Sequence, residues 1–239
     1  MATTSQTRTA PATVEFVGPP RGLIAVSESI SLARADWRLD GSITEYLAQR
    51  GSVLRQSRRH GGAMRLRLLP HTPPGDYAAK LYISDKEVAA VVRVLPVVQA
   101  TISPSEVSFV GAPGSTVTAR MILVNSGNVP VELPKTAPVG VFDDEGIETA
   151  FAATYGKPIE TFDNFIQIFH GKLREAHGGV MKLTVIRGAG LHLPGTTAVV
   201  EMTLDLPGNL RPGHRYHGVY STDFAALAIS VIVMKGNLK

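Results

Sequence analysis

Four histidines in the second half of the chain could take part in metal binding. His170 and His177 are seven positions apart, which on a helix places them on one face but separated by about 10 Å of rise, too far to bind one metal ion together. His214 and His217 would point to opposite faces of a strand. The spacing therefore predicts capping or surface roles for the first pair and a turn role for the second.

An acidic run is the second candidate for chemistry. Asp143, Asp144 and Glu145 are consecutive, and Glu148 follows closely. Carboxylate oxygens bind hard cations, but the run lacks the ligand spacing of a calcium loop. We predict a solvated acidic loop, with metal binding as the alternative.

The short motifs that usually carry catalysis are absent from the chain. There is no Gly-x-Ser-x-Gly, His-Glu-x-x-His, Gly-x-x-x-x-Gly-Lys or complete Gly-x-Gly-x-x-Gly sequence, and no cysteine. We expect no catalytic residues, no cofactor and no bound metal, and hence a protein that is not an enzyme. A metal-binding or enzymatic domain whose site lacks a local motif stays open as an alternative.

A basic cluster occupies the first half of the chain. No acidic residue lies between Glu45 and Asp76, whereas six arginines do: Arg50, Arg55, Arg58, Arg59, Arg65 and Arg67. Alternation over 64–68 predicts a strand with its arginines facing outward. A solvated face is the simplest interpretation, and an acidic protein surface is the functional one. Interleaved aromatics that would stack bases are missing, which argues against a nucleic acid partner.

Three sequence patches occur twice along the chain, in the same order. Val14-Glu-Phe-Val-Gly returns at Val107, His60-Gly-Gly returns at His177, and Pro74-Gly75 returns at Pro212. The offset grows from 93 to 117 and then to about 138, so the second copy carries two insertions. The chain is therefore expected to contain two copies of one fold.

Each copy consists of short apolar stretches separated by Gly and Pro, which predicts strands and turns. Apolar residues make up 44% of the chain and charged residues 18%, enough to build two cores. The fold class is expected to be all-β, with two tandem immunoglobulin-like β-sandwiches. The strongest strand signals lie at 64–69, 77–83, 88–95, 116–125, 181–186, 198–206 and 225–234.

The drifting offset also predicts the domain bounds. Residues 1–12 are expected to form a flexible tail, 13–97 the first domain and 98–239 the second. The insertions of the second domain fall near 135–176 and 187–206, and we expect the second of them to hold a Gly-rich turn within an added hairpin.

The first insertion contains one strong helix signal. An apolar stripe with helical spacing predicts a helix over 162–176, ended by Gly178-Gly179. We expect this stripe to pack on the second sandwich, and the alternative is that it docks on a partner. A capping-box spacing at Ser42 and Glu45 predicts a further short helix in the first copy. The stripe consists of Phe162, Phe165, Ile166, Phe169, Leu173 and Ala176.

A family resemblance rests on the strand at Val107, on an apolar strand that ends at Asn125-Ser-Gly-Asn128, and on the closing Pro-Gly-x-x-Tyr hairpin. The pattern resembles the major sperm protein, ASPM-SPD-2-Hydin and PapD-like group of immunoglobulin-like sandwiches. PapD-like pilus chaperones are similar in having two such domains, and they hold subunits by donating an edge strand. This chain shows neither a signal peptide nor their anchoring Arg/Lys pair, so no functional residue is transferred.

These observations favour a structural or assembly protein that binds other proteins through sheet edges and inserted loops, within a larger assembly or as a homo-oligomer. A PapD-like periplasmic chaperone for pilus subunits is the alternative function. The partner-binding candidates are the arginines at 55, 58, 59, 65 and 67 and the phenylalanines of the stripe. No membrane span is expected. The sequence as written indicates the cytoplasm, and the periplasm would follow if a signal peptide had been removed.

Overall fold

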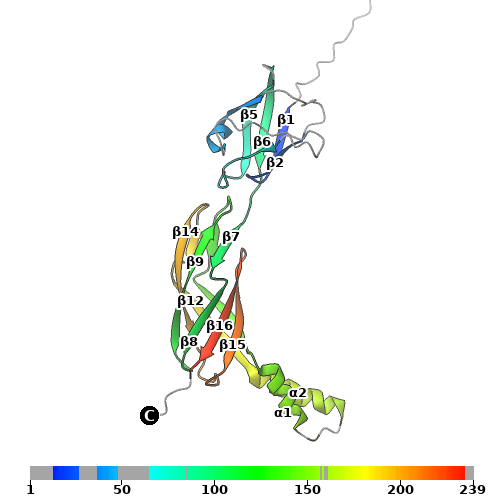
Figure 1. The fold of residues 1–239 in the computed structure, drawn as a ribbon, viewed down its shortest axis with the longest axis vertical. Coiled ribbons are helices and arrows are strands. Elements are labelled where there is room, and N and C mark those ends of the chain that lie inside the picture. The colour runs from blue at the N-terminus through cyan, green and yellow to red at the C-terminus, as the bar shows by residue number, and fades with distance from the viewer. Residues whose placement is uncertain are drawn as a thin grey trace, which may run out of the picture. The chain divides into compact units, whose positions relative to one another are not determined.

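A computed structural model describes residues 13–26, 37–47, 65–83, 86–156, 158 and 161–234. The chain divides into two compact units, residues 1–99 with 126–129, and residues 100–125 with 130–239. Each unit is built almost entirely of strands, and two helices are added to the second (Figure 1). The fold is all-β with two tandem immunoglobulin-like β-sandwiches, as the sequence predicts.

The described residues of the first unit form one sheet of six strands in the order β3-β5-β6-β1-β2-β4. Alternating side chains such as Phe16, Leu81 and Val92 are fully buried and form its core. Its elements are β1 (Val14–Gly18), β2 (Leu23–Val26), β3 (Trp37–Gly41), the 3₁₀ helix η1 (Ser42–Tyr46), β4 (Arg65–Leu66), β5 (Gly75–Ile83) and β6 (Lys86–Val94).

In the second unit the described residues form a main sheet of eight strands in the order β7-β9-β14-β12-β11-β15-β16-β8, and a small sheet of β10 and β13. Its elements are β7 (Ala100–Ser103), β8 (Glu106–Gly111), β9 (Thr116–Asn125), β10 (Val131–Leu133), β11 (Thr136–Asp143), α1 (Gly146–Tyr155), α2 (Phe162–Ala176), β12 (His177–Arg187), β13 (Gly190–His192), β14 (Thr197–Asp205), β15 (Arg215–Ser221) and β16 (Ala226–Val233).

The two units share one pattern of strand pairing around their last strands, β6 and β16. In the first, β1 runs parallel to β6, and in the second, β8 runs parallel to β16. The last strand is supplied in both by an antiparallel hairpin, β5–β6 or β15–β16. Two of the repeated patches, the opening strand and the closing Pro-Gly turn, therefore have equivalent places in the two copies. His60-Gly-Gly lies outside the described residues.

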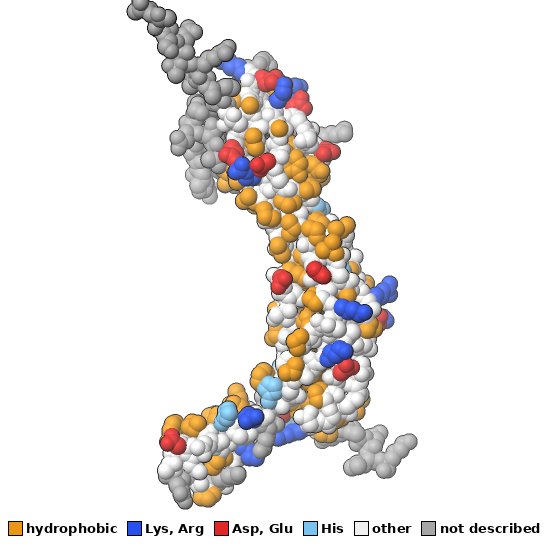
Figure 2. Space-filling view, turned by 180° about the vertical axis from the view of Figure 1, so that it is seen from behind, with side chains coloured by type: hydrophobic (Ala, Val, Ile, Leu, Met, Phe, Trp, Pro, Cys, Tyr) orange, Lys and Arg blue, Asp and Glu red, His pale blue; other side chains and the backbone are white. Residues whose placement is uncertain are grey.

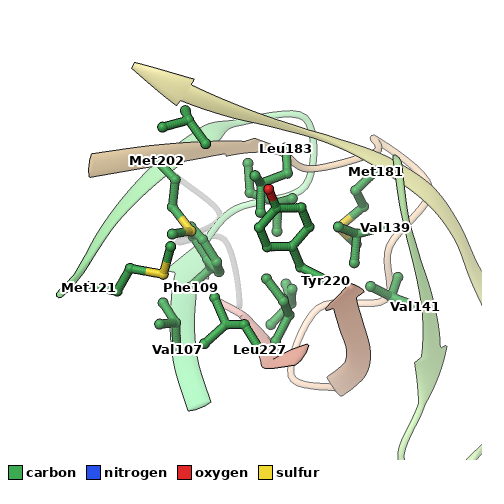
Figure 3. Close-up of a cluster of buried hydrophobic side chains, with 14 of the residues drawn as sticks. Val107, Phe109, Met121, Val139, Val141, Met181, Leu183, Met202, Tyr220 and Leu227 are labelled. Carbon is green, nitrogen blue, oxygen red and sulfur yellow. The ribbon is translucent and has the colours of Figure 1, made fainter. Parts of the chain in front are cut away.

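The core of the second sandwich is one continuous cluster of buried apolar side chains (Figure 3). Phe109 from β8, Met202 from β14 and Leu183 from β12 are all fully buried there. Tyr220 from β15 lies among them, and its hydroxyl is buried without a hydrogen-bond partner in the described structure. A hydroxyl in that position costs free energy on folding.

The segment 126–129, between β9 and β10, belongs to the first unit. The Asn128 side chain accepts a hydrogen bond from the backbone N–H of Val97 and donates to the carbonyl oxygens of Thr72 and Leu95. A Cβ at Gly127 would collide with the carbonyl oxygen of Val97. The Ser-Gly-Asn sequence is thus explained by a close backbone approach and by the hydrogen bonds of one buried amide.

Several expectations about local structure need correction. The short helix predicted at Ser42 is present as η1, but its capping box is not formed, because Gly41 is the N-cap and no side chain caps the helix. The second insertion supplies β13, but that strand pairs with β10 rather than within its own hairpin. The first insertion contains a second helix, α1, that the sequence reading missed.

Candidate functional site

The predicted basic cluster lies mostly outside the described residues. Arg55, Arg58 and Arg59 fall there, and so does the side chain of Arg65, whose backbone belongs to β4. Arg67 is described and exposed. The basic surface therefore stays a prediction, and the candidate site is built from the first insertion.

The first insertion joins two antiparallel neighbours of the sheet, β11 and β12, and Phe142 pairs with His177 at its base. It consists of α1 and α2, which lie beyond one end of the second sandwich (Figure 1). We call this pair of helices the helical hairpin.

Local sequence explains why α2 forms where it does. The hydroxyl oxygen of Thr161 accepts a hydrogen bond from the backbone N–H of Asn164 at 3.2 Å and so caps the first turn. Asp163 lies in the first turn and Arg174 in the last, each with the sign that the helix dipole favours. The helix ends at Ala176, and the backbone N–H of the next residue, His177, donates to the carbonyl oxygen of Arg174. The Nδ1 atom of His177 accepts the N–H of Gly179. His177 thus has a local structural role at the helix end, in line with the predicted capping or surface role.

The helices of the hairpin pack mainly against each other, through aromatic rings. The Phe151 and Phe169 ring centroids are 4.3 Å apart, and those of Tyr155 and Phe165 are 5.4 Å apart. Such ring pairs stabilise a contact by about 1 kcal/mol beyond area burial. Ala150 and Thr154 of α1 are buried in the same contact region.

One face of the helical hairpin remains uncovered. Phe162 is 74% exposed, Tyr155 69% and Ile147 61%. Hydrophobic side chains are visible along the hairpin in Figure 2. We call this surface the hairpin face, and its exposed apolar residues are Ile147, Phe151, Tyr155, Phe162, Ile166 and Leu173.

The expectation that the helical stripe packs on the second sandwich is wrong. The buried core cluster of that sandwich contains no residue from α1 or α2. Phe165 and Phe169 are half-buried against α1, and Phe162 is exposed. α2 is amphipathic, as predicted. Its apolar stripe is partly covered by α1, a helix that the sequence analysis does not predict.

A pocket of about 570 Å³ lies where the helical hairpin meets the sandwich. Ile147 and Leu173 of the hairpin face form part of its wall, so the pocket continues that apolar surface. Its full lining is Phe142, Asp143, Asp144, Gly146, Ile147, His170, Leu173, Arg174 and His177.

The acidic run is only in part the solvated loop that we predicted: Asp144 and Glu145 are exposed, but Glu148 lies in α1 and Asp143 is buried. The Asp143 side chain, at the end of β11, is only 2% exposed, and its Oδ2 lies 2.9 Å from Nδ1 of His214. Its Oδ1 accepts the backbone N–H of Glu145. Oδ2 of Asp144 lies 3.2 Å from Nε2 of His217. His214 and His217 therefore each pair with an aspartate, which the predicted turn role did not include. These pairs join the base of the hairpin to β15.

A buried aspartate that holds a histidine is also the orienting pair of hydrolytic triads, which need a nucleophile as the third member. A second pocket, of about 330 Å³, adjoins His214, and its lining contains no Ser, Thr or Cys. Across the described ranges, no three or more His, Asp or Glu side chains are grouped to hold a metal ion.

No helix within the described residues combines the length and the apolar character needed to cross a membrane.

Comparisons with known proteins give structural neighbours only. No family model matches the chain, and no curated protein matches it. An ASH / PapD-like domain of human CEP192 is similar at 13% identity, over 59% of this chain and 88% of that one, with a TM-score of 0.32. Titin-A168169 is similar at 11% identity, over 94% and 97%, with a TM-score of 0.33. Domains 4 and 5 of the S-layer protein SbsC are similar at 13% identity, over 89% and 91%, with a TM-score of 0.28.

The main element that sequence reasoning missed is α1, and a signal for it exists. Ile147, Phe151 and Tyr155 recur every four residues, and Ala150 and Thr154 lie between them. This is the periodicity of an amphipathic helix. The acidic residues at 143–145 and 148 favour a solvated loop, and this interpretation leads away from a helix at the same place.

Proposed function

We propose that this chain is a non-enzymatic assembly protein, and that it binds another protein through the hairpin face. The observation that carries the proposal is the exposure of six large apolar side chains along an inserted helical hairpin, several of them linked by ring contacts. A contiguous apolar patch of this kind marks an interaction site in most proteins that show one. Aromatic side chains supply much of the energy of such interfaces.

The rigid base of the hairpin supports the same proposal. Binding surfaces are commonly carried by segments grafted on a rigid scaffold. Here the hairpin interrupts the junction of two paired strands, and the pair between Asp143 and His214 ties its base to β15. The proposal takes the second domain to be residues 98–239, with the first insertion beginning after Asp143.

Sheet edges are the weaker candidates for binding. β6 has β5 on one side and, over Ala90–Val94, β1 on the other. β16 is likewise flanked by β15 and β8. The edges of the described main sheets are β3, β4, β7 and β8, none longer than six residues, and short edges resist strand addition. This arrangement disfavours the alternative of a chaperone that donates its closing strand.

Site-specific photo-cross-linking in the source cell tests the proposal. A photoreactive residue at Phe162 is expected to give a discrete protein adduct. The matched control is Val219, which is 56% exposed on β15 but far in sequence from the hairpin. The adduct at 162 should disappear when Ile166→Asp is added. Equal adducts from both positions, or none from 162, would refute the proposal.

A further inference from the structure

We propose that the partner of the hairpin face is a second copy of this chain, docked antiparallel along α2 so that two hairpins form a four-helix bundle. The inference rests on the proposed function, because it names the partner of the same surface. It follows from the spacing of the apolar residues and from the placement of two charges.

Four of the six residues of the apolar stripe of α2 lie along one narrow line of the helix. Phe162, Ile166, Phe169 and Leu173 recur at i, i+4, i+7 and i+11, which places them within about 60° of one another around the helix. Phe151 of α1 packs beside Phe169 and widens the stripe. Within the described residues of one copy, no further element covers this face of α1 and α2. In a bundle of four helices, the two helices of the second copy would cover it.

The stripe is complementary to itself when one copy is reversed. A two-fold axis beside the middle of α2 places Phe162 level with Leu173 of the second copy. In the same register Ile166 lies level with Phe169 of the second copy. A symmetric dimer requires this kind of reciprocal match, because the same surface serves both sides of the interface.

The charges on one flank of the stripe favour the same antiparallel register. Asp163 and Arg174 are both exposed, and the helical repeat places them on the same flank of the stripe. Neither forms an ion pair with another described residue. In an antiparallel pair like flanks meet, so Asp163 faces Arg174 of the second copy at both ends. In a parallel pair opposite flanks meet, so Asp163 would not face Arg174 of the second copy.

The same charges disfavour a membrane surface as the occupant. Helices that lie on membranes carry mainly Lys and Arg on the polar face. α1 has Glu148 in its first turn and no basic residue in its last, and α2 begins with Asp163. The N-terminal turns of both helices are therefore acidic, and only α2 has a basic last turn, with Arg174. This mixture of charges suits a charged protein partner better than an anionic lipid.

Sedimentation velocity of the purified full-length chain tests the inference. We expect a reversible dimer when the concentration rises from about 1 to about 100 µM. Phe162→Asp should weaken this dimer at least about tenfold, because it places a charge in the apolar contact with Leu173 of the second copy. Val219→Asp, on the exposed face of the sandwich, is the matched control and should leave the dimer unchanged.

Charge exchange then tests the register. Asp163→Arg and Arg174→Asp should each weaken the dimer about threefold to tenfold, and the double variant should restore it to within about twofold. A mixture of the two single variants should form a heterodimer tighter than either homodimer. A double variant as weak as the single ones would overturn the antiparallel register and with it the inference.

A chain that stays monomeric at every concentration would also overturn the inference, and so would a dimer that Phe162→Asp leaves intact. If the monomer instead floats with vesicles of anionic lipid, the occupant is a membrane and the inference fails. The proposed function is judged separately: a photo-adduct from position 162 to a different protein would leave it standing, and the absence of any adduct would refute it.

Discussion

The core of the second sandwich and the helical hairpin use the same kinds of side chain in opposite ways. Phe109 in the core is fully buried, whereas Phe162 on the hairpin is 74% exposed. In the sandwich, strands from both ends of the sheet cover the apolar side chains, and in the hairpin each helix covers only one side of the other. Apolar residues stabilise the chain where a second layer covers them, and elsewhere they are available for association.

Truncation of one phenylalanine in each region should give the largest contrast. Phe109→Ala is expected to lower the free energy of unfolding of the second sandwich by about 3–5 kcal/mol, because it leaves a cavity in a closed core. Phe162→Ala should lower it by less than about 0.5 kcal/mol. Urea unfolding monitored by circular dichroism measures both changes, and similar losses would remove the distinction between the regions.

A pair of glycines in neighbouring strands tests how tightly the sandwich is packed. A Cβ at Gly218 would lie 2.5 Å from the carbonyl oxygen of Gly140, whereas a Cβ at Gly140 would meet nothing within 4 Å. Gly218→Ala should therefore lower the free energy of unfolding by about 2–3 kcal/mol through overpacking. Gly140→Ala is the control and should change it little. Equal effects would mean that the sheet relaxes easily.

The two aspartates at the base of the hairpin should differ as well. Asp143 is buried and bonded to His214, while the Asp144 side chain is 54% exposed beside His217. Asp143→Asn should lower the free energy of unfolding by about 1–2 kcal/mol, because it weakens a charge-assisted hydrogen bond. Asp144→Asn should cost less than about 0.5 kcal/mol, as exposed pairs usually do. Thermal unfolding of both variants decides this, and the reverse order would contradict the geometry.

Removal of the hydroxyl from each of two buried tyrosines of β15 should change the free energy of unfolding least, and with opposite signs. The Tyr216 hydroxyl accepts the backbone N–H of Arg211, so Tyr216→Phe should cost about 1 kcal/mol. The Tyr220 hydroxyl has no partner in the described structure, so Tyr220→Phe should stabilise the chain by about 1 kcal/mol. A loss on Tyr220→Phe as large as that on Tyr216→Phe would show that the hydroxyl is hydrogen-bonded after all.

Burial also raises the pKa of Tyr220 above its ordinary value near 10. The unfolded chain then ionises at lower pH than the folded one, so stability is fully present below about pH 10 and falls as the pH rises through the folded pKa. Tyr220→Phe should reduce this alkaline loss. Unfolding midpoints measured between about pH 8 and pH 11 would reveal the effect, and identical slopes for the two proteins would contradict it.

Local sequence predicted the strongly periodic elements well. The expected strand 116–125 and the expected helix 162–176 match β9 and α2 in their bounds. Both have long, regular apolar patterns, which depend only on neighbouring residues. The repeat also predicted that the two copies share one fold, because the repeated patches form the opening strand and the turn before the closing hairpin in both copies.

The partners of individual side chains could not be predicted in the same way. Asp143 meets His214 only because β11 and β15 lie side by side in the sheet, 71 positions apart in the sequence. When the helix signal at Ile147, Phe151 and Tyr155 is overlooked, the sandwich is the nearest apolar surface that can be expected to cover the stripe of α2. Which surface covers a stripe is a property of topology, and the spacing of the stripe contains no information on it.

The most direct test of the account is to excise the helical hairpin. Phe142 and His177 face each other across β11 and β12, so replacing residues 144–176 with a single glycine leaves Asp143-Gly as a two-residue turn of a favoured type. If the hairpin is an added binding module, the free energy of unfolding of the second sandwich should change by less than about 1 kcal/mol. A loss of several kcal/mol, or a chain that no longer folds, would show that the hairpin belongs to the core and would contradict the account.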